Sequence, residues 1–221
     1  MSIEIKKRIG LGQTIFKFEL SNKFISTINN KVDDDLKLGQ AIDASDSLSA
    51  KIIREYHILH HLPTLDVDGE VDDCISAVLN ETPYDDKFKI KEVNVIAAWV
   101  NDQRKHEYQV VHIHSGNIQT GFSSILYLRT LEDYGKELQH PWMPCNGRTE
   151  LISNGGGMFS IPSVRVTPKV GDFYIFPYDM QHMVYPFSAE GTRRSMSINF
   201  DVYFEKDENS LASSQIDSPY Q

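Results

Sequence analysis

Two histidines separated by a single residue, His112 and His114, stand in the segment QVVHIHSG, residues 109–116. Residues two apart on a β-strand point to the same face, with their Cβ atoms roughly 7 Å apart. Two imidazoles placed in this way can bind one metal ion at adjacent positions of its coordination shell. Two surface histidines would give the same pattern, so a metal site needs support from other residues.

A third histidine, His182, follows a segment with the pattern of a short buried strand. In GDFYIFP, residues 171–177, Gly-Asp predicts a turn, the apolar run predicts a strand, and the proline predicts its end. His182 is therefore expected at the mouth of the sheet. Taken alone, a histidine at such a place indicates no function.

The segment RRSMSINF, residues 193–200, follows this histidine. On a strand, Arg193, Ser195, Ser197 and Asn199 share one face, while the other face is mostly apolar. An arginine beside small hydroxyls suits a pocket that holds a carboxylate, because the guanidinium offers two parallel donors and Ser195 adds a hydroxyl. The alternative is an exposed strand with an ordinary surface arginine.

Together these segments resemble the iron(II)- and 2-oxoglutarate-dependent dioxygenases, in particular the small prolyl-hydroxylase-like members of marine bacteria and phages. The resemblance extends from about residue 90 to residue 204. Its motifs are WVN (99–101), HIHSG (112–116), SSILYL (123–128), VGDFYIFP (170–177), HMVYPF (182–187) and RRSMSINF (193–200). Each motif is weak alone, and their order and spacing carry the specificity.

The resemblance implies a mainly β fold with flanking helices, a double-stranded β-helix or jelly roll with the metal inside one end. It implies Fe(II) as the metal, with His112, His114 and His182 as its ligands, and 2-oxoglutarate and O2 as co-substrates. Arg193 and Ser195 would bind the far carboxylate of 2-oxoglutarate, with Tyr127 as a further hydrogen-bond donor. The implied reaction is hydroxylation of an unidentified substrate, with release of succinate and CO2.

One departure concerns the second ligand. The family's usual motif is His-x-Asp or His-x-Glu, whereas this chain has His-x-His. Three neutral imidazoles would leave the iron centre one unit more positive. Alternatively, His114 lies outside the coordination shell, or a carboxylate elsewhere, such as Glu132 or Asp133, completes the site. Two other functions stay open: a cupin-like three-histidine metal enzyme that does not use 2-oxoglutarate, and a non-catalytic jelly-roll binding module.

The elements that must position these residues are mostly short strands. Runs rich in Val, Ile, Tyr and Phe, separated by Gly and Pro, predict an antiparallel sandwich or barrel in the second half of the chain. We expect one domain over residues 1–204, with an N-terminal supporting layer over about 1–90 and a jelly-roll core over about 91–204. The polar, Ser-rich residues 205–221 are expected to form a mobile tail.

Within the supporting layer, alternating apolar residues predict a strand over 15–20, and Ser21 is expected to cap a short helix. The acidic run 33–35 is expected to be a solvated turn, and residues 71–79 suit a second short helix. The long insertion at about 129–160 is where we expect substrate choice to be made.

The composition excludes several classes of protein. The 221 residues include 22 Lys and Arg against 31 Asp and Glu, a net charge of −9, which argues against binding to nucleic acid or anionic lipid. Only two cysteines, outside any CxxC pair, argue against a disulfide framework. Without a signal-like or membrane-spanning apolar run, a cytoplasmic protein with no membrane association is expected, acting on a small-molecule or peptide substrate. The oligomeric state is not encoded in these patterns.

Overall fold

The computed structural model describes residues 7–10 (backbone only), 13–44, 51–52, 54–66, 68–81, 89–136, 144–153 and 161–205. Its elements, in order, are β1 (Lys7–Gly10), β2 (Thr14–Glu19), α1 (Asn22–Leu38), β3 (Ile42–Asp43), β4 (Glu55–His57), the 3-10 helix η2 (Leu59–His61), α2 (Leu62–Leu65), α3 (Glu70–Glu81), β5 (Ile90–Arg104), β6 (Gln109–His112), β7 (Gly121–Arg129), β8 (Thr149–Ile152), β9 (Ser163–Val166), β10 (Asp172–Pro177), β11 (Gln181–Val184) and β12 (Thr192–Phe204). No helix in the described ranges is long and apolar enough to cross a membrane.

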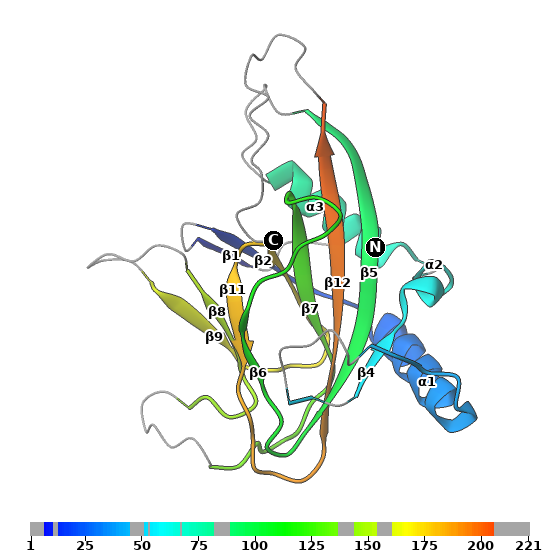
Figure 1. Ribbon diagram of the computed structural model, residues 1–221, viewed down its shortest axis with the longest axis vertical. Coiled ribbons are helices and arrows are strands. Elements are labelled where there is room, and N and C mark those ends of the chain that lie inside the picture. Colours follow the sequence, from blue (N-terminus) through cyan, green and yellow to red (C-terminus); the bar gives the residue numbers. More distant parts are fainter. Residues whose placement is uncertain are drawn as a thin grey trace.

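The described strands form two antiparallel sheets. The large sheet has the order β1-β2-β10-β7-β12-β5-β4-β3, and the small sheet has the order β6-β11-β8-β9. Figure 1 shows the long strands β5 and β12 side by side, with α1 and α2 on one side of the large sheet and the small sheet on the other. The expected mainly β jelly roll with flanking helices is confirmed.

Two apolar cores lie on the two faces of the large sheet. The core beneath the helices joins Phe24 and Ile28 of α1 to Cys74 of α3 and to Met196 and other apolar residues of β12. The second core lies between the sheets and includes Tyr127, Leu151 and Phe176. The alternation expected for β12 is thus confirmed, because its apolar residues face the helices while Ser195, Ser197 and Asn199 line a cavity between the sheets.

The start of the first helix is as expected, since the Ser21 hydroxyl accepts a hydrogen bond from the Phe24 amide at 3.1 Å. The prediction of a solvated turn at residues 33–35 is wrong. The helix continues to Leu38 and ends at Gly39 in the left-handed conformation, with φ of 66°. Asp33 ion-pairs with Arg194 at 2.7 Å, and Asp35 ion-pairs with Lys31 at 2.6 Å. The first pair attaches α1 to the sheet, because Arg194 lies on β12, whereas the second lies within the helix itself.

The insertion expected at about residues 129–160 contains a strand of the small sheet, β8, which lies between β11 and β9. It therefore builds the small sheet as well as connecting other elements. Residues 137–143 and 154–160 of this insertion lie outside the described residues, as do 206–221 of the expected polar tail.

Candidate metal centre

His112 and His182 lie directly opposite each other in the small sheet, as a cross-strand pair of β6 and β11. The ring of each is oriented by the carbonyl oxygen two residues earlier in the chain. His112 Nδ1 donates to Val110 O at 2.8 Å, and His182 Nδ1 donates to Met180 O at 3.0 Å. A neutral imidazole held in this way keeps the lone pair of Nε2 free for a metal ion.

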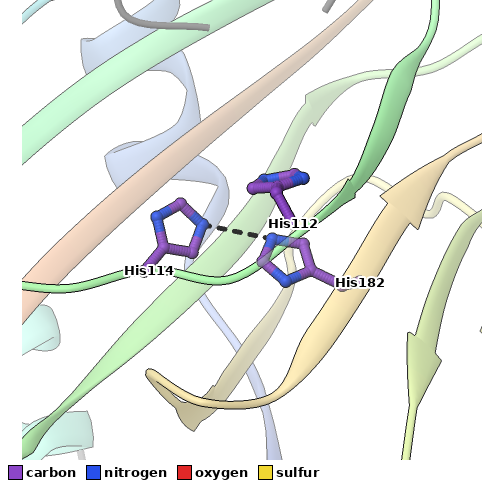
Figure 2. Close-up of side chains that lie close together, drawn as sticks. All are labelled: His112, His114 and His182. Carbon is purple, nitrogen blue, oxygen red and sulfur yellow. Dashed lines mark hydrogen bonds between the residues drawn. The ribbon is translucent and has the colours of Figure 1, made fainter. Parts of the chain in front are cut away.

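His114 joins this pair from the loop that follows β6. The strand ends at His112, so the expected strand alternation does not place His114. Instead, the His114 amide donates to Tyr178 O at 3.0 Å, and the ring packs against Trp99 with centroids 5.7 Å apart. Its Nε2 lies 3.1 Å from His182 Nε2 (Figure 2). That separation suits two neighbouring ligands on an ion with metal–nitrogen bonds of about 2.1 Å.

Ligand atoms of His112, His114 and His182 all lie within 4.8 Å of one another. Burial lowers the pKa of all three imidazoles, that of His114 to about 3, so they are neutral at physiological pH, as metal binding requires. In the part of the chain that the structure describes, no carboxylate joins this group, and neither Glu132 nor Asp133 belongs to it. The arrangement suits a divalent transition-metal ion held by three nitrogens.

A buried carboxylate fixes the loop that carries His114. Asp201 accepts hydrogen bonds from the Tyr178 hydroxyl at 3.0 Å and from the Asn117 amide at 3.1 Å. Tyr178 in turn holds the His114 amide through its own carbonyl. A Cβ atom on Gly116 would overlap the Asp201 carboxylate, so only glycine allows this close approach.

Replacing Gly116 with alanine is therefore expected to displace the loop and to weaken metal binding by about tenfold, the scale of a lost supporting contact. The metal affinity of the variant, measured by titration with iron(II) under anaerobic conditions, checks this. Asn117→Ala is the matched control, because it keeps the backbone amide that contacts Asp201 and should bind iron as the wild type does. Equal affinities for Gly116→Ala and the wild type would contradict the role of the loop.

Arg193 is completely buried, with 1% of its surface exposed. Its guanidinium donates to Gly147 O at 3.0 Å and to the Ser195 hydroxyl at 3.3 Å, and it lies over the Tyr127 ring at 5.4 Å. Its Nε has no hydrogen-bond partner, and no carboxylate pairs with the side chain among the described residues. A buried cation without a counter-ion is unfavourable, so the site fits an acidic ligand group.

The Tyr127 hydroxyl is already engaged, because it donates to Thr149 Oγ1 at 2.8 Å. The tyrosine contacts Arg193 through its ring face. Its expected hydrogen bond to a carboxylate stays a prediction.

A cavity of about 420 Å³ lies between the sheets beside the three imidazoles. His112, His114, His182 and Ser195 line it, whereas Arg193 and Tyr127 do not belong to the lining. The structure therefore places four of the six candidate residues on the cavity wall and the other two in contact with them or with each other.

The wall also contains residues that sequence reasoning assigned no role, above all Glu55 of β4 and Asn101 and Trp99 of β5. Glu55 is 2% exposed, and burial together with the nearby Asp43 raises the pKa of its carboxyl to about 8. One sequence motif does point to this wall. It is WVN (99–101), whose alternate residues Trp99 and Asn101 line the cavity.

The raised pKa of Glu55 predicts a specific pH dependence of stability. In the unfolded chain this carboxyl titrates near 4.5, whereas in the folded chain it titrates near 8. The wild type should therefore lose stability as the pH rises from about 4.5 to about 8. Glu55→Gln removes that loss, so its melting temperature should exceed that of the wild type at alkaline pH and equal it near pH 5. Thermal unfolding across this range checks it.

Glu92→Gln, at an exposed position of β5, is the control and should show no such pH-dependent gain. A constant difference between Glu55→Gln and the wild type over the whole pH range would contradict the assignment.

Comparisons with known proteins agree with this geometry. A family model described as "Putative 2OG-Fe(II) oxygenase" matches residues 97–199, which include all six candidate residues. The comparison with curated protein sequences gives no match.

Among solved structures, the chain is similar to a prolyl-4-hydroxylase of Pseudomonas putida, with 12% identity, a TM-score of 0.56, and coverage of 85% of this chain and 91% of that one. A prolyl hydroxylase of Trichoplax adhaerens, in complex with a peptide fragment, has 15% identity, a TM-score of 0.59 and coverage of 92% and 88%. HygX of Streptomyces hygroscopicus, with nickel and 2-oxoglutarate bound, has 10% identity, a TM-score of 0.55 and coverage of 85% and 82%. Likeness at these identities establishes the fold.

Proposed function

We propose that the chain, which a model of the 2OG-Fe(II) oxygenases matches over residues 97–199, is an oxidoreductase that hydroxylates a small-molecule or peptide substrate. The products of the co-substrates would be succinate and CO2. The observation that carries this proposal is a cavity lined by three neutral imidazoles and by Ser195, which contacts a buried arginine with no carboxylate partner among the described residues.

In this proposal His112, His114 and His182 hold the iron. When bound, iron(II) with 2-oxoglutarate and O2 supplies an oxidant strong enough to attack a C–H bond. Arg193 and Ser195 hold the far carboxylate of 2-oxoglutarate through charge-assisted and hydroxyl hydrogen bonds. The Nδ1–H bonds to Val110 and Met180 keep two of the imidazoles in the tautomer that binds metal.

In this proposal the bound substrate and the apolar part of the cavity wall together would exclude bulk water from the place where the reaction occurs. Ile125, Phe176 and Val184 contribute apolar surface beside the metal ligands. A dry site limits side reactions of the oxidant and strengthens the polar contacts that orient the substrate. Two structures of similar fold support this substrate class. One contains a bound peptide fragment, and the other contains bound hygromycin B.

The cupin-like alternative shares the three-histidine site but has no use for a buried arginine beside it. Arg193, with no counter-ion among the described residues, therefore favours the 2-oxoglutarate-dependent reaction.

Oxygen consumption and succinate formation, measured together after addition of iron(II) and 2-oxoglutarate, test the proposal. We expect one succinate for each O2 consumed. Oxygen uptake without succinate would support the cupin-like enzyme, and binding of neither ligand would support a non-catalytic module.

A further inference from the structure

Glu55 lies in a row of polar residues that crosses the large sheet on its cavity side. In the strand register Glu55 is opposite Asn101, and Asn101 is opposite Ser195. Two interstrand spacings therefore separate Glu55 from Ser195, roughly 10 Å. Ser195, which Arg193 contacts, and Glu55 therefore belong to one continuous wall of the cavity, which two ligands could share.

The two oxygens of the Glu55 carboxyl group differ in their contacts. With its amide nitrogen toward Glu55, Asn101 donates to Glu55 Oε1 at 3.1 Å and accepts from Trp99 Nε1 at 3.3 Å. Glu55 Oε2 has no hydrogen-bond partner among the described residues, although the side chain is almost fully buried and lines the cavity. A buried oxygen without a partner is unfavourable, so a ligand donor at this point would stabilise the site.

The charges around this oxygen favour a cation. Apart from histidines, Glu55 is the only ionisable side chain among the described residues that line the cavity. Asp43 lies close enough to raise the pKa of Glu55 further. The indole of Trp99, on the same wall, offers an aromatic face that attracts ammonium groups.

The dicarboxylate 2-oxoglutarate is a poor partner for the ionised Glu55 carboxylate, because like charges repel, and the proposed function assigns its far carboxylate to Arg193. We therefore take the substrate, the other organic ligand of the cavity, as the partner of this oxygen. The His114 ring packs against Trp99, which is linked through Asn101 to Glu55. A group bound to Glu55 would consequently be held on the metal side of the wall.

We propose that Glu55 is a specificity-determining residue that binds a protonated amine, so that the substrate of this oxygenase carries a primary ammonium group near the hydroxylated carbon. This inference rests on the proposed function, because it assigns the amine to the substrate of the oxygenase. Binding of an amine at Glu55 does not itself depend on turnover. Asn101 acts as a positioning residue that fixes the Glu55 carboxyl group.

The test uses n-butylamine as the probe, with 1-butanol as the neutral analogue and butyrate as the anionic one. Binding is followed by the fluorescence of Trp99 in the Trp142→Phe background, which leaves a single tryptophan. The protein is loaded anaerobically with iron(II) and 2-oxoglutarate at about pH 8.5, where Glu55 is ionised. The wild type should bind n-butylamine saturably and more tightly than either analogue.

Glu55→Gln should weaken n-butylamine binding by about ten- to a hundredfold, the value of a charge-assisted hydrogen bond, and leave 1-butanol binding unchanged. Glu55→Asp keeps the charge and should retain the preference for the amine over butyrate. Equal n-butylamine affinities in the wild type and Glu55→Gln, or tighter binding of butyrate than of the amine, would overturn the inference.

A separate control distinguishes this failure from failure of the proposed function. Iron(II) and 2-oxoglutarate binding of Glu55→Gln should equal that of the wild type, because neither ligand is assigned to Glu55. If the wild type binds no 2-oxoglutarate, the proposed function fails, while the amine titration on the iron-loaded protein still decides the role of Glu55.

Discussion

Replacement of His182 with alanine is expected to abolish iron(II) binding and to reduce succinate formation to background. His182 is 6% exposed and connects the other two imidazoles, one through the β6–β11 pairing and one through the 3.1 Å approach of His114. The described residues offer no fourth ligand in the group that could take its place. The loss should exceed the ten- to hundredfold reduction in metal affinity that is typical when only a supporting partner is removed.

His57→Ala is the control for this experiment. His57 lines the same cavity from β4 but does not belong to the ligand group, so the variant should bind one iron per chain as the wild type does. Iron content after anaerobic loading and desalting measures both variants. Wild-type iron content in His182→Ala would show that the histidine cluster does not hold the iron.

Replacement of Arg193 with methionine is expected to weaken 2-oxoglutarate binding by about ten- to a hundredfold, because a charge-assisted hydrogen bond contributes about 1.5–3 kcal/mol. Methionine fills a similar volume without the charge, so iron binding should persist. The variant should also lose most of the rise in melting temperature that 2-oxoglutarate gives the iron-loaded wild type. Anaerobic titration of the iron-loaded protein with 2-oxoglutarate gives the affinity.

Two other arginines are excluded as anchors by their ion pairs. Arg194 pairs with Asp102 and Asp33 on the helix side of the large sheet, and Arg165 pairs with Glu150 of β8. Arg165→Met should therefore leave the 2-oxoglutarate affinity unchanged. An unaltered affinity in Arg193→Met, or an equal loss in Arg165→Met, would show that the anchor lies elsewhere.

The strands of the jelly roll were predictable because their side-chain alternation is a local property of the sequence. The faces of β12 follow directly from the pattern RRSMSINF, and β10 ends at Pro177 as expected. The helix from Ser21 was likewise predictable from its capping residue and apolar spacing. Its length was not, because the carboxylates of Asp33 and Asp35 depend on partners that only the fold brings near.

The metal centre was only partly predictable for the same reason. The three histidines are visible in the sequence, but His114 is placed by loop contacts with Tyr178 and Trp99 that no periodicity encodes. Glu55 was missed because its role follows from the pairing of β4 with β5, two strands whose register the sequence does not show. The long-range pairing of β4 with β5 therefore determines that Glu55 lies on the cavity wall.

The visible spectrum of the anaerobic protein shows most directly whether three histidines hold an iron that binds 2-oxoglutarate. Iron(II) and 2-oxoglutarate are added to the wild type and, in parallel, to His114→Ala. We expect a weak visible charge-transfer band in the wild type and its loss in the variant. A wild-type protein that binds iron(II) but shows no band with 2-oxoglutarate would contradict it.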